Sequence, residues 1–213
     1  MEAGARVYGG VSAEDRRAKR REQLLDAGLE LLGTEGWPGT TMTAVCAKAG
    51  LTERYFYESF ADREALLIAV FDRIAAEAAG AVLAAVEASP REARARTHAA
   101  IGAFVGLMTD DPRKGRVAFA EAMGSAALMA RRFEAIRTFA TLLGDQAREF
   151  YGLPAGGNDM LDLTSFLLVG GLAEALVAWL GGELETSREQ LIEDCTDLFV
   201  ATGEAAVAIA RAR

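Results

Sequence analysis

Residues 41–60, TMTAVCAKAGLTERYFYESF, decide the fold of this chain. Thr41 precedes a short apolar helical pattern and is placed to cap it, because a threonine hydroxyl accepts hydrogen bonds from the free N–H groups at a helix start. Ala49 and Gly50 end that pattern with a small residue followed by one that adopts a positive φ at little cost. The segment therefore predicts a helix, a tight glycine turn and a second helix.

The second of these helices has an apolar side and a polar side. Phe56 and Phe60 are four residues apart, so both point to the same face of a helix and are expected to be buried. Thr52 is placed to cap this helix. The other side chains lie on faces that are free to enter the major groove of DNA: Thr52, Glu53, Arg54, Tyr55 and Tyr57.

Apolar residues recur at helical spacing on both sides of this segment, and no run keeps the period of two that a strand requires. The four prolines fall between these runs, where helices start or stop. The pattern predicts an all-α chain of about nine helices, with a three-helix head in residues 1–63 and a helical body in residues 64–213. The expected helices are residues 13–34, 41–48, 52–58, 62–88, 91–109, 113–125, 127–152, 159–182 and 187–211.

The composition limits the class of protein. A chain of 213 residues is long enough to bury a core without disulfides or metals. Cys46 and Cys195 have no second Cys or His at metal-ligand spacing, so we expect two reduced cysteines in the core or an interface, and neither a metal nor another cofactor. The longest run without a charged residue, 97–109, is too short to span a bilayer, and the N-terminus does not resemble a secretory signal. These features predict a cytoplasmic protein without a membrane span.

The net charge of −8 is unfavourable for binding nucleic acid, but it is unevenly distributed. Residues 1–63 hold almost equal numbers of basic and acidic side chains, so most of the excess acid lies in residues 64–213. Five cations lie close together in the head: Arg16, Arg17, Lys19, Arg20 and Arg21. This cluster either contacts the DNA backbone or is the solvated start of the first helix.

The stretch AGLTERYFYESFADREALL, residues 49–67, closely resembles the helix-turn-helix and following helix of tetracycline-repressor-like (TetR family) regulators. The resemblance extends over residues 17–74. The matching positions are Leu24, Ala27, Leu31 and Gly36 in and after the first helix, Ala49, Gly50 and Leu51 in the turn, Phe56, Tyr57 and Phe60, and the pair Arg63 and Glu64. It implies a transcriptional regulator that binds a pseudo-palindromic operator in double-stranded DNA as a homodimer and responds to a small-molecule effector.

The same resemblance implies which side chains contact DNA. The helix starts at Thr41 and Thr52 offer free N–H groups to phosphates, and the phenol of Tyr57 donates to a phosphate oxygen. Arg54 and Tyr55 are long enough to reach base edges or a thymine methyl group. The full set implied is Thr41, Thr43, Thr52, Arg54, Tyr55, Tyr57 and Arg63.

Two acidic residues depart from the family's pattern. Glu53 and Glu58 occupy positions where relatives often carry Lys, His or another neutral or basic residue. Glu53 either accepts a hydrogen bond from a cytosine amino group or faces solvent with Arg54 as its partner. For Glu58 the sequence leaves open whether the side chain faces DNA or solvent.

By resemblance, the body holds an effector pocket and a dimer interface. The candidates for the pocket are apolar side chains that helical spacing directs to a common space: Phe104, Met108, Phe119, Met123, Phe139 and Phe166. Met and Phe at this spacing are also typical of an ordinary core. Charged groups are sparse here, and Glu121 and the only histidine, His98, face either the pocket or the solvent. A small, largely apolar and neutral effector is therefore expected.

Residues 159–182 and 187–211 carry the apolar stripes expected for dimerisation, and Gly170 and Gly171 allow close approach of a neighbouring helix. Two such helices from each subunit form a four-helix interface. A dimer of this kind presents two recognition helices to successive major grooves about 34–36 Å apart. The interface candidates are Leu168, Leu172, Trp179, Leu191, Cys195 and Leu198.

Together these features favour a repressor that occludes its operator and is released when an effector binds the body. The sequence has one His, no phosphate-binding glycine loop and no Ser or Cys paired with a base, so no enzyme activity is expected. Two alternatives stay open: a helical carrier or enzyme whose head no longer binds DNA, and an architectural DNA-binding protein or activator without an effector. Binding to DNA separates the first from a repressor, and release by an effector separates the second.

Overall fold

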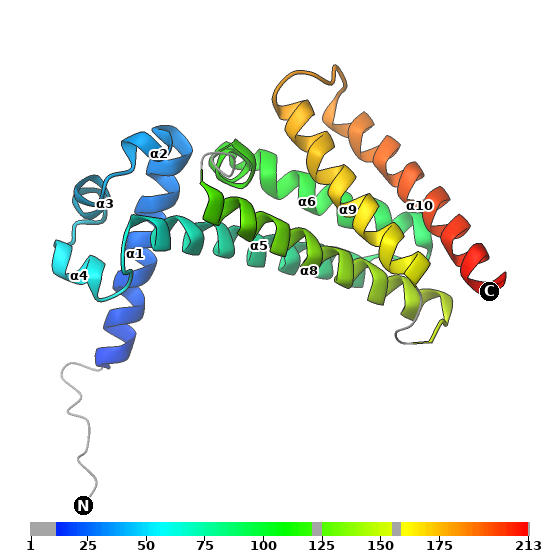
Figure 1. Cartoon of the computed structure of the whole chain (residues 1–213), viewed down its shortest axis with the longest axis horizontal. Coiled ribbons are helices and arrows are strands. Elements are labelled where there is room, and N and C mark those ends of the chain that lie inside the picture. The colour runs from blue at the N-terminus through cyan, green and yellow to red at the C-terminus, as the bar shows by residue number, and fades with distance from the viewer. Residues whose placement is uncertain (1–11, 121–124, 155–158, 213) are drawn as a thin grey trace, which may run out of the picture. The chain divides into compact units, whose positions relative to one another are not determined.

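The computed structural model describes residues 12–120, 125–154 and 159–212, and within these ranges all regular structure is helical. The predicted all-α fold class is confirmed (Figure 1). The helices are α1 (Ala13–Thr34), α2 (Gly36–Gly39), α3 (Met42–Ala49), α4 (Glu53–Tyr57), α5 (Arg63–Ala88), α6 (Ala93–Asp110), α7 (Pro112–Gly115), the π-helix η1 (Arg116–Ala120), α8 (Ala126–Tyr151), α9 (Asp159–Leu180) and α10 (Arg188–Ala212).

The chain divides into two compact units, Met1–Arg73 and Ile74–Arg213, which are called the head and the body from here on. The division falls inside α5. The first part of this helix therefore packs in the head, and the remainder packs in the body.

In the head, α1 contacts α2, α3 and α4 and contributes much of the core. The side chains of Leu24, Leu32, Val45 and Phe56 are completely buried. A capping box starts α1, because the Ser12 hydroxyl accepts the N–H of Asp15 and the Asp15 carboxylate accepts the N–H of Ser12. The core therefore holds α3 and α4, which carry the sequence motif, against α1.

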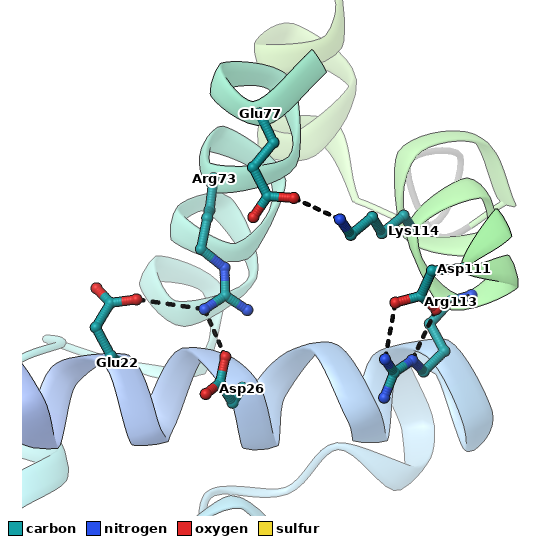
Figure 2. A network of polar contacts seen from close by, with 7 residues as sticks. All are labelled: Glu22, Asp26, Arg73, Glu77, Asp111, Arg113 and Lys114. Carbon is teal, nitrogen blue, oxygen red and sulfur yellow. Dashed lines mark hydrogen bonds and ion pairs between the residues drawn. The ribbon is translucent and has the colours of Figure 1, made fainter. Parts of the chain in front are cut away.

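The α5 helix makes ion pairs in both units. In the head, Arg73 donates to Asp26 of α1 at 2.7 Å and to Glu22 at 3.4 Å (Figure 2). In the body, Glu77 of α5 pairs with Lys114 of α7 (Figure 2). Arg73 and Glu77 are one helical turn apart, so α5 changes from head contacts to body contacts within that turn.

In the body, α9 packs against α8 and α10, and α10 also packs against α6. Figure 1 shows α9 and α10 side by side. Val105, Val117, Leu128 and Leu176 are completely buried in this core. Arg148 of α8 is also buried, and it pairs with Asp145 and with Asp162 of α9, so a charged contact joins these two helices.

The segment predicted as one helix over residues 113–125 differs in the structure. Pro112 restricts Asp111 to an extended backbone, and the Asp111 side chain accepts the N–H of Arg113 and starts the short α7. The π-helix η1 follows, and its residues Val117, Ala118 and Phe119 are all buried. Packing, rather than an amphipathic period, therefore determines this conformation.

Within the part of the chain that the structure describes, one segment is long and apolar enough to cross a membrane, Met160–Leu180 in α9, with a mean hydropathy of 1.8. The sequence-based expectation required an uncharged run, whereas this segment includes Asp162 and Glu174. One such helix is weak evidence for a membrane span, because the core helix of a globular protein passes the same test of length and composition. Only 28% of the most apolar window is buried within this single chain.

Candidate functional site

The helix-turn-helix consists of α3, α4 and the turn between them. The hydroxyl of Thr41 accepts the N–H of Ala44 at 3.1 Å and caps α3 as predicted. Gly50 ends α3 with a φ of 65°, in the left-handed region that favours glycine. Thr52 takes the N-cap position of α4, but its side chain makes no capping hydrogen bond, contrary to the prediction. Its main-chain carbonyl instead accepts the N–H groups of Tyr55 and Phe56.

Two aromatic rings anchor α4 to the head. Phe56 is completely buried and Phe60 is 5% exposed, which confirms that both face inward. Their ring centroids are 5.8 Å apart, and the ring of Tyr57 meets Phe56 edge-on at the same distance. Because one side of the helix is anchored, the opposite side faces solvent.

The seven residues implied to contact DNA fall into two groups. Tyr55 and Arg63 are half-buried. The other five are exposed: Thr41, Thr43, Thr52, Arg54 and Tyr57. The side chain of Arg54 is 84% exposed and Tyr57 is 58% exposed, so these two long side chains have room to reach a ligand.

The guanidinium of Arg63 makes several contacts within the head. Its guanidinium lies over the ring of Trp37, 3.7 Å from the centroid. Nη1 of Arg63 also donates to the main-chain carbonyls of Trp37 at 3.4 Å and Thr40 at 3.3 Å. Arg63 thus supports the turn that leads into α3.

The cationic cluster on α1 contacts the helix-turn-helix, which the sequence pattern did not reveal. The guanidinium of Arg20 lies 4.4 Å from the ring centroid of Tyr55, and that of Arg21 lies 5.1 Å from the centroid of Phe60. These residues are far apart along the chain, and no local spacing rule relates them. A local signal exists only for the pair of Arg54 with Glu58, which are four residues apart.

Glu58, and not Glu53, is the residue that pairs with Arg54. The distance from Arg54 Nε to Glu58 Oε1 is 3.3 Å. Arg20 Nη2 pairs with the second oxygen of the same carboxylate at 3.4 Å. The side chain of Glu58 is 34% exposed, so it lies between arginines rather than free in solvent.

Both cysteines are free and buried. Burial is the main cause that raises the pKa of the Cys46 thiol, and the nearby Glu53 adds to it. Burial likewise raises the pKa of Cys195, with a smaller contribution from Asp194. A raised pKa keeps both thiols protonated near neutral pH, so neither has the character of a catalytic nucleophile. Among the described residues, no group of three or more His, Cys, Asp or Glu is arranged to hold a metal ion.

The predicted pocket residues occupy different environments. Phe104 of α6 and Phe139 of α8 are half-buried, with ring centroids 5.8 Å apart. Met108 and Phe119 are buried, whereas Phe166 is 46% exposed on α9. Met123 and Glu121 lie outside the described residues. The Nε2 atom of His98 lies 3.2 Å from Glu193 Oε1, and the imidazole is 44% exposed.

The body also has an open groove of about 440 Å³, formed by residues of α5, α6, α7 and α10 and by Asp111. None of the five predicted pocket residues that the structure describes lines it. Five small or apolar residues and four charged residues line it: Ala81, Gly102, Ala103, Gly106, Leu107, Asp110, Asp111, Lys114 and Arg188. Arg188 Nη1 donates to Asp110 Oδ1 at 2.7 Å within this group.

The predicted interface residues also differ in exposure. Leu191 and Cys195 are buried within the single chain, because α10 directs them toward its neighbours in the body, and they have little surface left for a second copy. Leu168, Leu172 and Trp179 are half-buried. Leu198 is 64% exposed. Two large apolar side chains of α9 that were not predicted for the interface are also exposed, Leu163 and Leu167.

Solved structures of similar fold are bacterial transcription regulators. A tetR-family transcriptional regulator from Streptomyces coelicolor has a TM-score of 0.72 and 17% identity, over 90% of this chain and 83% of that one. The fatty acid degradation regulator FadR from Bacillus halodurans has a TM-score of 0.70 and 16% identity, over 84% and 94%. FadR from Bacillus subtilis, in complex with stearoyl-CoA, has a TM-score of 0.69 and 16% identity, over 85% and 98%. At these identities the likeness shows the fold alone.

The family comparison concerns the helix-turn-helix itself. No curated protein sequence matches the chain. Residues 24–70 match the family model described as bacterial regulatory proteins, tetR family, and this range holds α3, the glycine turn, α4 and the anchoring rings of Phe56 and Phe60. The helix-turn-helix of this chain is therefore similar to that of the tetR family of bacterial regulatory proteins.

Proposed function

We propose that this regulator is a dimeric repressor that binds a pseudo-palindromic operator in the cytoplasm and leaves it when a small, largely apolar effector binds the body. The observation that carries the DNA-binding part is the division of α4 into a buried aromatic side and an exposed side with Arg54 and Tyr57. A recognition helix needs this division, because its anchored side fixes the geometry of the side chains that enter the groove.

In this proposal the exposed residues have separate roles. Arg54 reads a base edge, since an arginine that bonds guanine through two N–H groups is the commonest specific contact. Tyr57 and the threonines Thr41, Thr43 and Thr52 contact the backbone and set the register of the helix on the duplex. Arg63 acts mainly through the Trp37 turn.

The exposed apolar surface of α9 and α10 supports dimerisation. Leu163 and Leu167 of α9 are 55% and 63% exposed, and Leu198 of α10, the helix packed against α9, is 64% exposed. Large apolar side chains exposed on two adjacent helices are typical of an interaction surface. In the proposed dimer, this surface pairs with its own copy and forms a four-helix interface. The second recognition helix that a palindromic operator requires then comes from the second subunit.

The effector part rests on the apolar interior of the body and on α5. Phe104 and Phe139 are half-buried and face each other from α6 and α8, so a ligand that separates them meets apolar surface. The FadR structure from Bacillus subtilis holds stearoyl-CoA, whose acyl chain is the kind of apolar group expected here. Because α5 belongs to both units, a ligand that favours one arrangement of the body biases the head, and DNA in turn disfavours that ligand.

One experiment tests the proposed function directly. The purified protein is used to enrich duplexes from a random-sequence DNA pool, and the enriched sequences are aligned. We expect a pseudo-palindrome whose half-sites are centred about 10 base pairs, or a multiple of that, apart. Enrichment of no sequence would exclude a sequence-specific regulator, and a single unrepeated half-site would exclude the dimeric mode of binding.

A further inference from the structure

Glu58 joins three arginines from two parts of the head. Its carboxylate pairs with Arg54 of α4 at 3.3 Å and with Arg20 of α1 at 3.4 Å. Its main-chain carbonyl accepts a hydrogen bond from Arg17 Nη2 at 2.6 Å. We call these four residues, together with Tyr55, the Glu58 cluster. It connects the first helix of the chain with the helix expected to enter the major groove.

The Glu58 cluster holds α1 to α4 at two points. Arg20 uses Nη2 for the carboxylate of Glu58, and its guanidinium also covers the ring of Tyr55, 4.4 Å from the centroid. The Tyr55 ring is half-buried as a result. The side chain of Arg20 is only 24% exposed, so its position is restricted by two contacts rather than one.

The charges in the Glu58 cluster do not cancel. The cluster contains one carboxylate, which pairs with Arg54 and Arg20, and a third guanidinium on the main-chain carbonyl of Glu58, so it is cationic although it contains an acidic residue beside the DNA-facing side of α4. A lone carboxylate at this place would repel phosphate, whereas a paired one lowers the local positive charge without reversing it. Exposed ion pairs of this kind contribute little to the stability of the fold. Their main effect is therefore to restrict the positions of the paired side chains.

Glu58 occupies only part of the hydrogen-bonding capacity of Arg54. The ion pair uses Nε, and the Nη1 and Nη2 groups lie outside it. The side chain is 84% exposed, so without this contact it would sample many rotamers. A guanidinium fixed at Nε keeps N–H donors available for a base edge while it loses less conformational freedom on binding.

We propose that Glu58 is a positioning residue for DNA recognition: it orients Arg54 for base reading and holds Arg17 and Arg20 of α1 beside α4 as phosphate contacts. This inference rests on the proposed function and adds to it the device that sets specificity. It also explains how an acidic residue is compatible with a DNA-binding surface.

The test starts from DNA selected by the full-length wild-type protein. The selection is repeated with Arg54→Ala to find the base pair whose preference depends on Arg54. If the wild type enriches no sequence, the proposed function fails and the inference fails with it. If the wild type enriches a sequence and Arg54→Ala changes no preference, only the base-reading assignment and this inference are wrong.

Glu58→Gln removes the charge and keeps the shape of the side chain. We expect the preference at the Arg54-dependent base pair to fall on the order of tenfold. The affinity for a scrambled duplex is expected to rise, because one negative charge near the phosphates is lost. In the background of Arg54→Ala, Glu58→Gln is expected to cause no further loss at this base pair, since both residues act through one contact.

Glu53→Gln is the matched control, because it makes the same charge change at the opposite end of α4, outside the Glu58 cluster. It is expected to leave the preference at the Arg54-dependent base pair unchanged. If Glu58→Gln raises the affinities for selected and scrambled DNA by the same factor, Glu58 acts only by repulsion and the inference is wrong. The inference is also wrong if neither affinity changes.

Arg20→Gln tests the phosphate contacts and does not depend on the Glu58 variant. We expect binding to selected and scrambled duplexes to weaken together, with the slope of log affinity against log salt concentration reduced by about one. An unchanged slope, with thermal unfolding like that of the wild type, would show that α1 makes no phosphate contact through Arg20.

Discussion

Tyr57 combines an exposed hydroxyl with a ring that is fixed against the core. Its ring meets Phe56 edge-on at 5.8 Å, while 58% of the residue faces solvent. A phenol held in this way donates to a phosphate at little entropic cost. Tyr57→Phe should weaken binding to selected and scrambled duplexes equally, by about 1 kcal/mol each, as measured by titration at one salt concentration. Tyr151→Phe removes the same atom in the body and should leave both affinities unchanged; a larger loss on selected DNA would make Tyr57 a base reader.

Arg63 depends on the shape of its guanidinium as well as on its charge. The planar group covers Trp37 at 3.7 Å and donates to two carbonyls, and an ammonium group reproduces neither arrangement. We therefore expect Arg63→Lys to destabilise the folded head by about 1 kcal/mol, with a lower midpoint in urea unfolding. If stability is unchanged and the affinity for DNA falls, Arg63 contacts DNA directly, as the family resemblance implies.

At the scale of the elements, Gly50 and Gly80 differ in backbone conformation, and replacing each with alanine tests the effect of that difference on stability. A Cβ added at either glycine would meet no atom within 4 Å, so packing does not contribute to the effect of either substitution. Gly50 has a φ of 65°, which strains any other residue, whereas Gly80 lies inside α5. Gly50→Ala should destabilise the protein by about 1 kcal/mol, and Gly80→Ala should stabilise it by up to about 1 kcal/mol. Urea unfolding followed by circular dichroism measures both; the same sign for both variants would contradict the conformational argument at Gly50.

The same comparison explains how far the sequence predicts these elements. The cap at Thr41, the left-handed Gly50 and the buried Phe56 depend on residues within about four positions of each other, and local rules identify them. In the Glu58 cluster, Arg17 and Arg20 are 41 and 38 positions from Glu58, and Arg63 is 26 positions from Trp37, so only the packed head brings these residues together. Burial of Leu191 and Cys195 inside one chain has the same origin, because an apolar stripe does not tell which neighbour covers it.

At the scale of the whole molecule, the exposed apolar residues of α9 and α10 give the clearest prediction of assembly. Leu167 and Leu198 are 63% and 64% exposed, so a carboxylate at either position is solvated in a single chain. In the proposed dimer the same carboxylates are buried without partners, which is costly. The double variant Leu167→Asp with Leu198→Asp should therefore be a folded monomer by light scattering and should bind the selected palindrome weakly. Leu83→Asp, at a leucine of α5 that is 42% exposed, is the control and should stay dimeric; a dimeric double variant would place the interface elsewhere.

The proposed release by an effector also concerns the whole molecule, and two places in the body are candidates for the ligand site. One lies at Phe104 and Phe139, whose rings are 5.8 Å apart, and the other is the groove that Gly102 helps to line. Stearoyl-CoA is a suitable probe, and if it binds the folded body it should raise the unfolding temperature and release DNA over one range of concentration. Ala100 is one helical turn before Phe104, so Ala100→Phe fills the space at the first site, while Gly102→Leu fills the groove, where an added Cβ meets no atom within 4 Å.

We expect Ala100→Phe to abolish release by the probe and to leave the affinity for selected DNA unchanged, because the head is not altered. Gly102→Leu should be released at the wild-type concentration. The reverse pattern would move the effector site to the groove, whose Lys114 and Arg188 would then meet a polar group on the ligand. If both variants are released like the wild type, a ligand of this kind acts outside the body, and α5 does not transmit its effect to the head.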